Sequence, residues 1–172
     1  MTTPYFVFST LHSDNSATMQ SWVRFRTHIQ SVHPIVARPD AGVLPTSPAG
    51  SKPAASGIAS YWRLLASNNR EVARSYFLYS SFTRARVHVE QLLDAPDALS
   101  IVTLMGADIR THGWYATLDG VPVMTCSRWY GGSSAAYDAA RATVKALGTA
   151  VIVDGTRRPA MIPAGAVSGR ES

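Results

Sequence analysis

The chain contains one cysteine, Cys126, which is the strongest candidate for a nucleophile. Cys126 lies on the returning strand of a predicted hairpin, and His112 precedes the same hairpin. Across the Asp-Gly turn of that hairpin, His112 is expected roughly opposite Ser127, so the imidazole and the thiol could approach each other. A catalytic thiolate needs an electropositive, partly exposed setting and a third group that orients the base. The sequence supplies neither, so we interpret Cys126 as a small apolar residue of a half-buried strand and predict no catalytic residue.

No other pattern in the sequence predicts a cofactor or a metal site. The five histidines are scattered, without an i, i+4 pair and without a neighbouring pair of carboxylates. Gly131 and Gly132 are not followed by the lysine of a phosphate-binding loop. The sequence also lacks paired carboxylates suited to acid–base catalysis. We therefore expect no metal, no cofactor and no enzymatic activity.

Three arginines of the first predicted hairpin form a candidate surface for anions or nucleic acid. A two-residue turn at Asn68-Asn69 would place Arg63 opposite Arg74, with Arg70 on the same sheet face. Like charges directly opposite each other are destabilising, so the pair must be splayed into water, matched by a glutamate or bound to an anion. An open sheet face with arginines and aromatic rings is typical of single-strand binders, and a solvated outer face is the alternative. A three-residue turn would break this pairing.

A helix is predicted from Ser13 to Val32 by the spacing of its apolar residues, and Pro34 prevents its continuation. An isolated helix of this length is marginal in water, so its apolar stripe must be buried somewhere. The helix either binds a partner or covers its own sheet as a lid, and we slightly favour its own sheet. The stripe, which is the candidate partner-binding surface, consists of Met19, Trp22, Val23, Ile29 and Val32.

Composition divides the chain into four parts. A β-prone run and the predicted helix come first, and a stretch rich in proline, alanine, serine and glycine follows, as is typical of a linker. Complete strand and helix patterns begin only after that stretch, so we expect the central part to fold without the residues before it. The parts are an N-terminal arm (1–36), a linker (37–59), a two-unit domain (60–155) and a C-terminal tail (156–172).

Two stretches of the sequence are similar: YWRLLASNNREVARSYFLYSSF begins at Tyr61, and GWYATLDGVPVMTCSRWYGGSS begins at Gly113. Each reads as a strand, a polar turn, a second strand, a short strand at a tyrosine and then a helix, with a last strand after it. One unit has too few strands to be stable alone, so the units, 60–107 and 111–155, should share one sheet. The first strand of each unit carries a tryptophan that we expect in the core, Trp62 and Trp114.

The first unit resembles the YegP-like family of small bacterial proteins, through the run WRLLASNNREVARS, Tyr79 and the serines before the helix. The second unit keeps the tryptophan, the Asp-Gly turn and Tyr130, but lacks the Arg-Leu and Asn positions. Over residues 60–155 the resemblance implies an α+β fold, in which two β-β-β-α-β units share one mainly antiparallel sheet with helices on one face. An extra strand and helix precede the units. The resemblance also implies an exchange of last strands, with 98–107 added to the second unit and 149–155 to the first, and it carries over no catalytic residue.

The chain has 172 residues and a formal net charge of +5. A polyanion partner and a solvated basic surface both explain this charge. One cysteine excludes an internal disulfide framework, and no apolar run is long enough to span a membrane, so we expect a soluble, cytoplasmic protein. The function predicted is a non-enzymatic binding or assembly module with a protein partner or self-association. A nucleic-acid-binding protein is the alternative, and an enzyme is the third.

Overall fold

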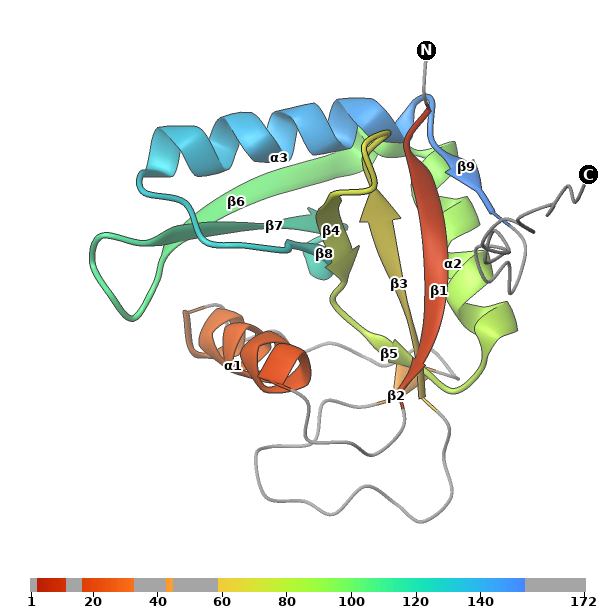
Figure 1. The fold of residues 1–172 in the computed structure, drawn as a ribbon, viewed down its shortest axis with the longest axis horizontal. Helices are drawn as coiled ribbons and strands as arrows, with labels where there is room; N and C mark the ends of the chain where they lie inside the picture. Colours follow the sequence, from red (N-terminus) through yellow and green to blue (C-terminus); the bar gives the residue numbers. More distant parts are fainter. Residues whose placement is uncertain (1–2, 12–16, 33–42, 45–58, 154–172) are drawn as a thin grey trace, which may run out of the picture.

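The computed structural model of the chain describes residues 3–11, 17–32, 43–44 and 59–153. They form an α+β fold with one mixed sheet and three α-helices, as Figure 1 shows. The helices are α1 (Ala17–Val32), α2 (Phe82–Asp94) and α3 (Ser133–Leu147), with a 3-10 turn, η1 (Pro96–Ala98). The strands are β1 (Tyr5–Leu11), β2 (Val43–Leu44), β3 (Ala59–Leu65), β4 (Glu71–Ser75), β5 (Leu78–Tyr79), β6 (Leu99–Met105), β7 (His112–Leu118), β8 (Val121–Cys126) and β9 (Val151–Ile152).

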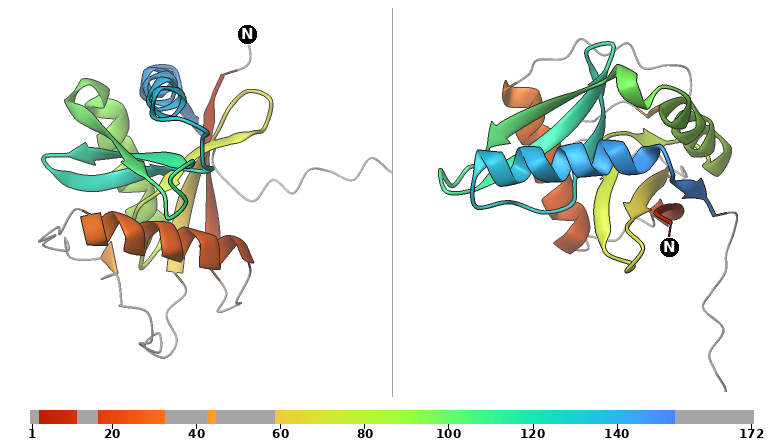
Figure 2. Two further views of the ribbon diagram at one scale, coloured as in Figure 1. Left: turned by 90° about the vertical axis from the view of Figure 1, so that its left-hand side faces the viewer. Right: turned by 90° about the horizontal axis from the view of Figure 1, so that it is seen from above.

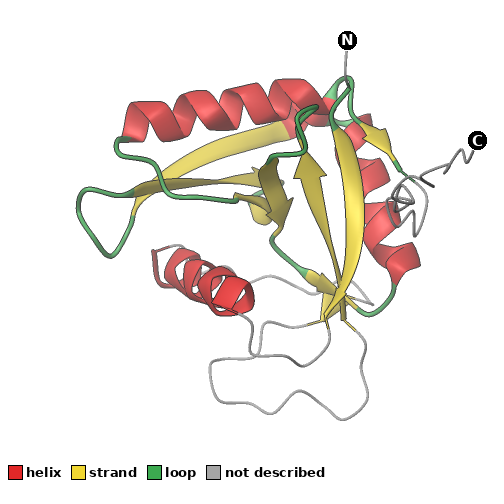
Figure 3. Cartoon of the chain, in the orientation of Figure 1, coloured by secondary structure: helices red, strands yellow, loops and turns green. Residues whose placement is uncertain are grey.

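The main strands lie in the order β9, β1, β3, β4, β8, β7, β6, and together they make one continuous sheet (Figure 3). The short β5 continues the path of β4 and pairs with the start of β3 and with β2. All of these pairings are antiparallel except that of β1 with β9, which is parallel. β6 runs along β7 from Leu99↔Leu118 to Met105↔His112, so it lies beside the strands of residues 111–155.

The edge of β3 is occupied by β1, which corrects the expected position of the last strand. Residues 149–155 were expected beside the first unit, but β9 pairs with β1 instead. β1 itself pairs with β3 along its whole length, and Phe6 is fully buried with its ring 5.2 Å from that of Trp62. β1 is therefore an internal strand, between β3 and β9.

Helices cover both faces of the sheet. α2 and α3 lie on one face, and α1 lies on the opposite face (Figures 1 and 2). Trp62 points toward α2, because its indole N–H donates to the Tyr79 hydroxyl at 3.1 Å, and that hydroxyl is hydrogen-bonded to Nδ1 of His88. The preceding residue, Tyr61, points the other way and lies against Trp22 of α1. The helices of the two predicted units, α2 and α3, thus lie on the same face of the sheet, and α1 covers the other face.

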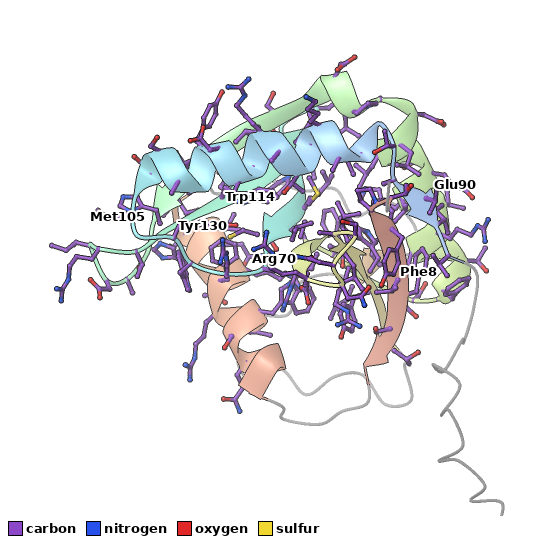
Figure 4. All side chains as sticks on the ribbon, turned by 45° about the horizontal axis from the view of Figure 1, so that its top comes forward. Phe8, Arg70, Glu90, Met105, Trp114 and Tyr130 are labelled. Atoms are coloured by element: carbon purple, nitrogen blue, oxygen red, sulfur yellow. The ribbon has the colours of Figure 1, made fainter. Side chains whose placement is uncertain are left out.

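Trp62 and Trp114 are both fully buried, which confirms that both belong to the core. Trp114 lies beneath α3, as Figure 4 shows. The backbone N–H group of each tryptophan faces a small side chain on the returning strand: Trp62 N is 3.4 Å from Ser75 Oγ, and Trp114 N is 3.3 Å from Cys126 Sγ. Each tryptophan strand is thereby tied to its neighbour by a side-chain acceptor in addition to the ladder of backbone hydrogen bonds.

The first hairpin has a three-residue turn, so the predicted two-residue turn at Asn68-Asn69 is wrong. The turn is closed by backbone hydrogen bonds at Ala66, and Asn69 takes a φ of 64°, which asparagine tolerates. This turn alone would have moved Arg63 out of register with Arg74. A β-bulge between the two strands compensates for the shift, so Arg63 and Arg74 do pair as predicted.

The second hairpin has the predicted two-residue Asp-Gly turn. Leu118 pairs with Val121, and φ is 51° at Asp119 and 78° at Gly120, which is the geometry that favours this dipeptide. Pro122 was expected either on an edge strand or beside a bulge. β8 is an internal strand, and a bulge in its pairing with β7 lies next to the proline, so the bulge is the explanation that holds.

A substitution in β1 tests whether this strand completes the core. Phe6→Ala should lower the free energy of unfolding by about 3–5 kcal/mol, because it leaves a cavity against Trp62. Thr10→Ala is the control in the same strand; Thr10 is exposed, so its change should stay within about 0.5 kcal/mol. Urea denaturation of the full chain measures both values. A chain that begins at residue 60 should lose its cooperative transition, and a sharp melt of residues 60–155 alone would show that β1 is dispensable.

Candidate ligand-binding pocket

Two hydrogen bonds hold α1 against the sheet, one near each end of its buried face. The indole N–H of Trp22 donates to the carbonyl oxygen of Ser75 at 3.1 Å. Nε2 of His28 lies 2.6 Å from the carbonyl oxygen of Met105, so this nitrogen carries the proton and donates it. α1 therefore bridges β4 in one half of the sheet and β6 in the other.

Between these two hydrogen bonds, Phe25 fits over a strand position that has no side chain. A Cβ atom on Gly113 would lie 2.8 Å from Cε2 of Phe25, which is too close for two carbon atoms. The ring of Phe25 also meets Trp129 edge to face, with the ring centroids 4.9 Å apart. The glycine thus lets α1 approach β7 closely, and it brings Trp129 against the helix.

A pocket of about 420 Å³ opens beside this contact, between α1, the sheet and the chain that leaves β8. Aromatic rings from α1 and from the segment after β8 form much of its wall. Arg74 and Arg128 add positive charge, and two serines add hydroxyl groups. The lining residues are Ser21, Trp22, Phe25, Arg74, Cys126, Ser127, Arg128 and Trp129.

The like charges of Arg63 and Arg74, which lie opposite each other, are matched by a glutamate. This is one of the three ways in which such a pair was expected to be tolerated. Glu71 accepts from Nε of Arg74 at 2.6 Å, and its second oxygen lies 3.7 Å from Nη1 of Arg63. Arg63 also donates to the hydroxyl of Ser9 at 3.3 Å. One carboxylate serves two guanidinium groups, so this face of the sheet keeps an excess of positive charge.

Arg70 does not belong to this group, which corrects the prediction that all three arginines share a face. Arg70 closes the turn of the first hairpin and is exposed there (Figure 4). The bulge in β4 is the physical reason, because it inserts one residue between Arg74 and the turn and so reverses the facing of the residues before it. Glu71 takes the position on the arginine face that the regular register would have given to Arg70.

The predicted stripe of α1 is only partly the buried face. Trp22 and Ile29 are buried against the protein's own sheet, whereas Val23 and Val32 are 41% and 57% exposed. The side chain of Met19 lies outside the residues whose burial is described. Two further residues of α1, Phe25 and Arg26, are buried but were not predicted, although each lies one helical turn from a residue of the stripe.

Cys126 and His112 are not arranged as a catalytic pair. The Cys126 thiol accepts from the backbone of Trp114, and burial raises the pKa of this thiol to about 11. His112 forms a two-way backbone pair with Tyr130, at 2.8 Å in each direction, and so does not lie opposite Ser127 as predicted. The bulge between β7 and β8 shifts the register by one residue, and the further shift to Tyr130 arises in the chain after β8.

Two other kinds of site receive no support from the described part of the chain. It contains no group of three or more histidine, cysteine, aspartate or glutamate residues that could hold a metal ion. Among its helices, none is both long enough and apolar enough to cross a membrane.

No protein-family model, curated protein or solved structure matches the chain at a significant level. We therefore infer the function from the chemistry of the pocket and of the side chains around it.

The position of Cys126 gives a test of its structural role. Because its pKa is raised, the thiol should be almost wholly protonated at pH 8 and should react slowly with iodoacetamide until the chain unfolds. Cys126→Ser keeps an acceptor for the Trp114 N–H group, as Ser75 does for Trp62, and should keep more stability than Cys126→Ala. The alanine variant should lose about 1 kcal/mol relative to serine, measured by urea denaturation. Rapid alkylation of the folded protein at pH 8 would contradict this account.

Proposed function

We propose that the protein is a non-enzymatic binding module and that the pocket beside α1 takes single-stranded nucleic acid. The observation that carries this proposal is the composition of the wall: three aromatic side chains and two arginines, with no acidic side chain among the described residues that line it. Aromatic rings stack on bases of any sequence, and arginines neutralise phosphates. A net charge of +5 and the excess of arginine beside the pocket support the same class of ligand.

Two residues at the mouth of the pocket are accessible to such a ligand. Trp129 is 43% exposed although its ring meets that of Phe25 edge to face, so part of the ring is accessible to a stacking base. Arg128 is exposed, and its guanidinium lies 4.9 Å from the ring centroid of Tyr130, which limits its freedom. A stacking ring beside a restrained cation reduces the entropy lost on binding.

The absence of enzymatic activity is part of this proposal. The one thiol in the wall of the pocket is kept protonated by burial, so it is a poor nucleophile at neutral pH. His112 pairs through its backbone with Tyr130 and so does not lie opposite Ser127. A chemical role would need a base and an orienting group that the described lining residues do not supply.

A protein partner or self-association is the second candidate, favoured by exposed apolar side chains at one end of the molecule. Met105 and Ile109 are 52% and 73% exposed, and they lie at or next to the loop between β6 and β7. Trp129 packs close to this loop, because its ring lies 3.1 Å from the position of a Cβ atom on Gly106. Sedimentation velocity of the full chain and of Ile109→Asp would show whether this end joins two copies.

We further propose that residues 60–155 are two tandem units of one β-β-β-α-β pattern, in line with the resemblance to YegP-like proteins. The pairings support this when Trp62 is aligned with Trp114 and Tyr79 with Tyr130. In each unit the backbone N–H group of the tryptophan then faces a small acceptor. The residue two positions before the tryptophan pairs with the tyrosine of the same unit. The bulge in the pairing of the first and returning strands falls at equivalent positions in the two units. Each helix begins three residues after its tyrosine.

The proposed exchange of last strands is one-sided in this arrangement. β6, which follows the first helix, pairs with β7 of the second unit. On the first unit the corresponding edge is taken by β1, and β9 is displaced outward by one strand. β1 thus pairs along β3 in the way that β6 pairs along β7. The arrangement that the resemblance implies has no such N-terminal strand at this position.

Binding of a fluorescein-labelled oligothymidine of about ten nucleotides tests the pocket proposal. Trp129→Ala should weaken binding by about 1–3 kcal/mol, the usual loss of one stacked base. Arg128→Ala should also weaken binding and should lower the slope of log affinity against log salt by about one. Fluorescence anisotropy at several sodium chloride concentrations measures both effects.

The matched control is Arg141→Ala, which removes the same charge from the exposed side of α3 on the other face of the sheet. It should leave the affinity close to that of the wild type. Equal losses in Arg128→Ala and Arg141→Ala would mean that the oligonucleotide senses only net charge. No binding at low salt would remove single-stranded nucleic acid as the ligand.

A further inference from the structure

Arg26 of α1 is a buried cation for which the described residues supply no acidic partner. The residue is only 5% exposed, and no described carboxylate forms an ion pair with it. Burial lowers the pKa of its guanidinium to about 10, so the group still carries its charge at neutral pH. A buried, unpaired charge costs stability, and a sequence selected for stability alone would place an apolar residue here.

The Arg26 guanidinium is packed against two aromatic rings, whereas two of its nitrogens have no hydrogen-bond partner among the described residues. Its central carbon lies 4.6 Å from the ring centroid of Trp22 and 5.0 Å from that of Tyr76, so the group is packed against two rings. Nε and Nη2 are both buried, and neither has a hydrogen-bond partner in the part of the chain that the structure describes. Each is a donor that would normally be paired inside a protein.

These two nitrogens belong to the same edge of the planar guanidinium. Their N–H bonds point in nearly the same direction, at the spacing of two oxygens of one phosphate or carboxylate group. Two unrelated donors left unpaired would suggest imperfect packing. Two parallel donors on one edge, on a guanidinium packed against two rings, form the pattern that receives one oxyanion.

We propose that the Nε/Nη2 edge of Arg26 binds one oxyanion, which under the function proposed above is a backbone phosphate of the bound strand. Trp22 links the two places, because its ring lines the pocket and also packs against Arg26, one helical turn further along the same face of α1. A base in the pocket and its phosphate at Arg26 would lie on consecutive turns of one helix. Both nitrogens are shielded from solvent, so binding requires α1 to shift outward from the sheet.

The experiment uses the full chain and the Arg Nε–H region of a 1H–15N spectrum. The Arg26 signal is identified as the one lost in Arg26→Lys, and the protein is titrated with sodium phosphate, with sodium acetate and with sodium chloride at matched ionic strength. Phosphate should move the Arg26 signal downfield and saturate, and chloride should not. At ten times the dissociation constant, phosphate should raise the wild-type folding equilibrium constant about elevenfold.

Arg26→Met supplies a second readout, because it keeps an apolar side chain of similar length against the two rings. In buffer without phosphate its melting temperature should equal or exceed that of the wild type, and phosphate should add nothing. Glu90→Gln, an exposed charge change on α2, is the control and should keep the phosphate response. A clear loss of stability in Arg26→Met together with an Arg26 signal that phosphate does not move would overturn the proposal, since the guanidinium would then already be paired.

The remaining outcomes separate the oxyanion from its proposed source. A response to acetate and not to phosphate would uphold an oxyanion site and overturn the assignment to a nucleic-acid phosphate. An Arg26 signal that is downfield before any addition and does not move would overturn the proposal, because an acceptor within the chain would already occupy the edge. If oligothymidine binding is lost in Trp129→Ala but the Arg26 Nε–H signal does not move, the proposed function is supported and the Arg26 site is overturned. If phosphate moves the Arg26 signal but oligothymidine does not bind, the Arg26 site is supported and the nucleic-acid-binding function is overturned.

Discussion

The close approach of α1 to β7 at Gly113 is the contact on which the second face of the molecule depends. Any side chain at that position would meet the ring of Phe25 and push the helix outward. With the glycine, α1 comes near enough for Trp22 and His28 to reach backbone carbonyl groups on two separate strands. The pocket, the burial of Arg26 and the position of Trp129 all follow from this one distance, because each lies between α1 and the sheet or at its margin.

The two faces of the sheet are stabilised in different ways. Under α2 and α3 the core is apolar and includes both fully buried tryptophans, with small acceptors that satisfy their backbone N–H groups. Under α1 the sheet carries two arginines that share one glutamate, and the helix adds a third, buried guanidinium. A face built for stability alone would not hold three cations for one described acidic partner. We therefore assign the first face to folding and propose the second for binding.

Much of the fold could be predicted from local sequence chemistry. The Asp-Gly turn, the burial of Trp62 and Trp114 and a mixed helix-and-sheet fold follow from turn preferences and apolar spacing. Long-range pairing could not be predicted in this way. No local pattern says that β1 will take the edge of β3 or that β9 will then lie outside it. That outcome depends on a competition between distant strands for one position.

One extra residue in β4, the bulge, decides which charged side chains share a face of the first hairpin. The pairing of Arg63 with Arg74 was predicted from a two-residue turn, and it exists because a three-residue turn and a bulge offset each other. The same bulge moved Arg70 off the face and brought Glu71 onto it, which no periodicity in β4 signalled. Arg26 was missed because an arginine inside an apolar helix face is usually assigned to the solvent side.

The indole N–H signals of the four tryptophans give the most direct measurement of the central claim, because the chain contains its own control. Trp22 and Trp129 line the pocket, whereas Trp62 and Trp114 are fully buried in the core. On titration of the 15N-labelled full chain with oligothymidine, the account predicts large shifts for Trp22 and Trp129 and near-constant signals for Trp62 and Trp114. Four unchanged signals at an oligonucleotide concentration that saturates binding would contradict it, because the strand would then bind elsewhere.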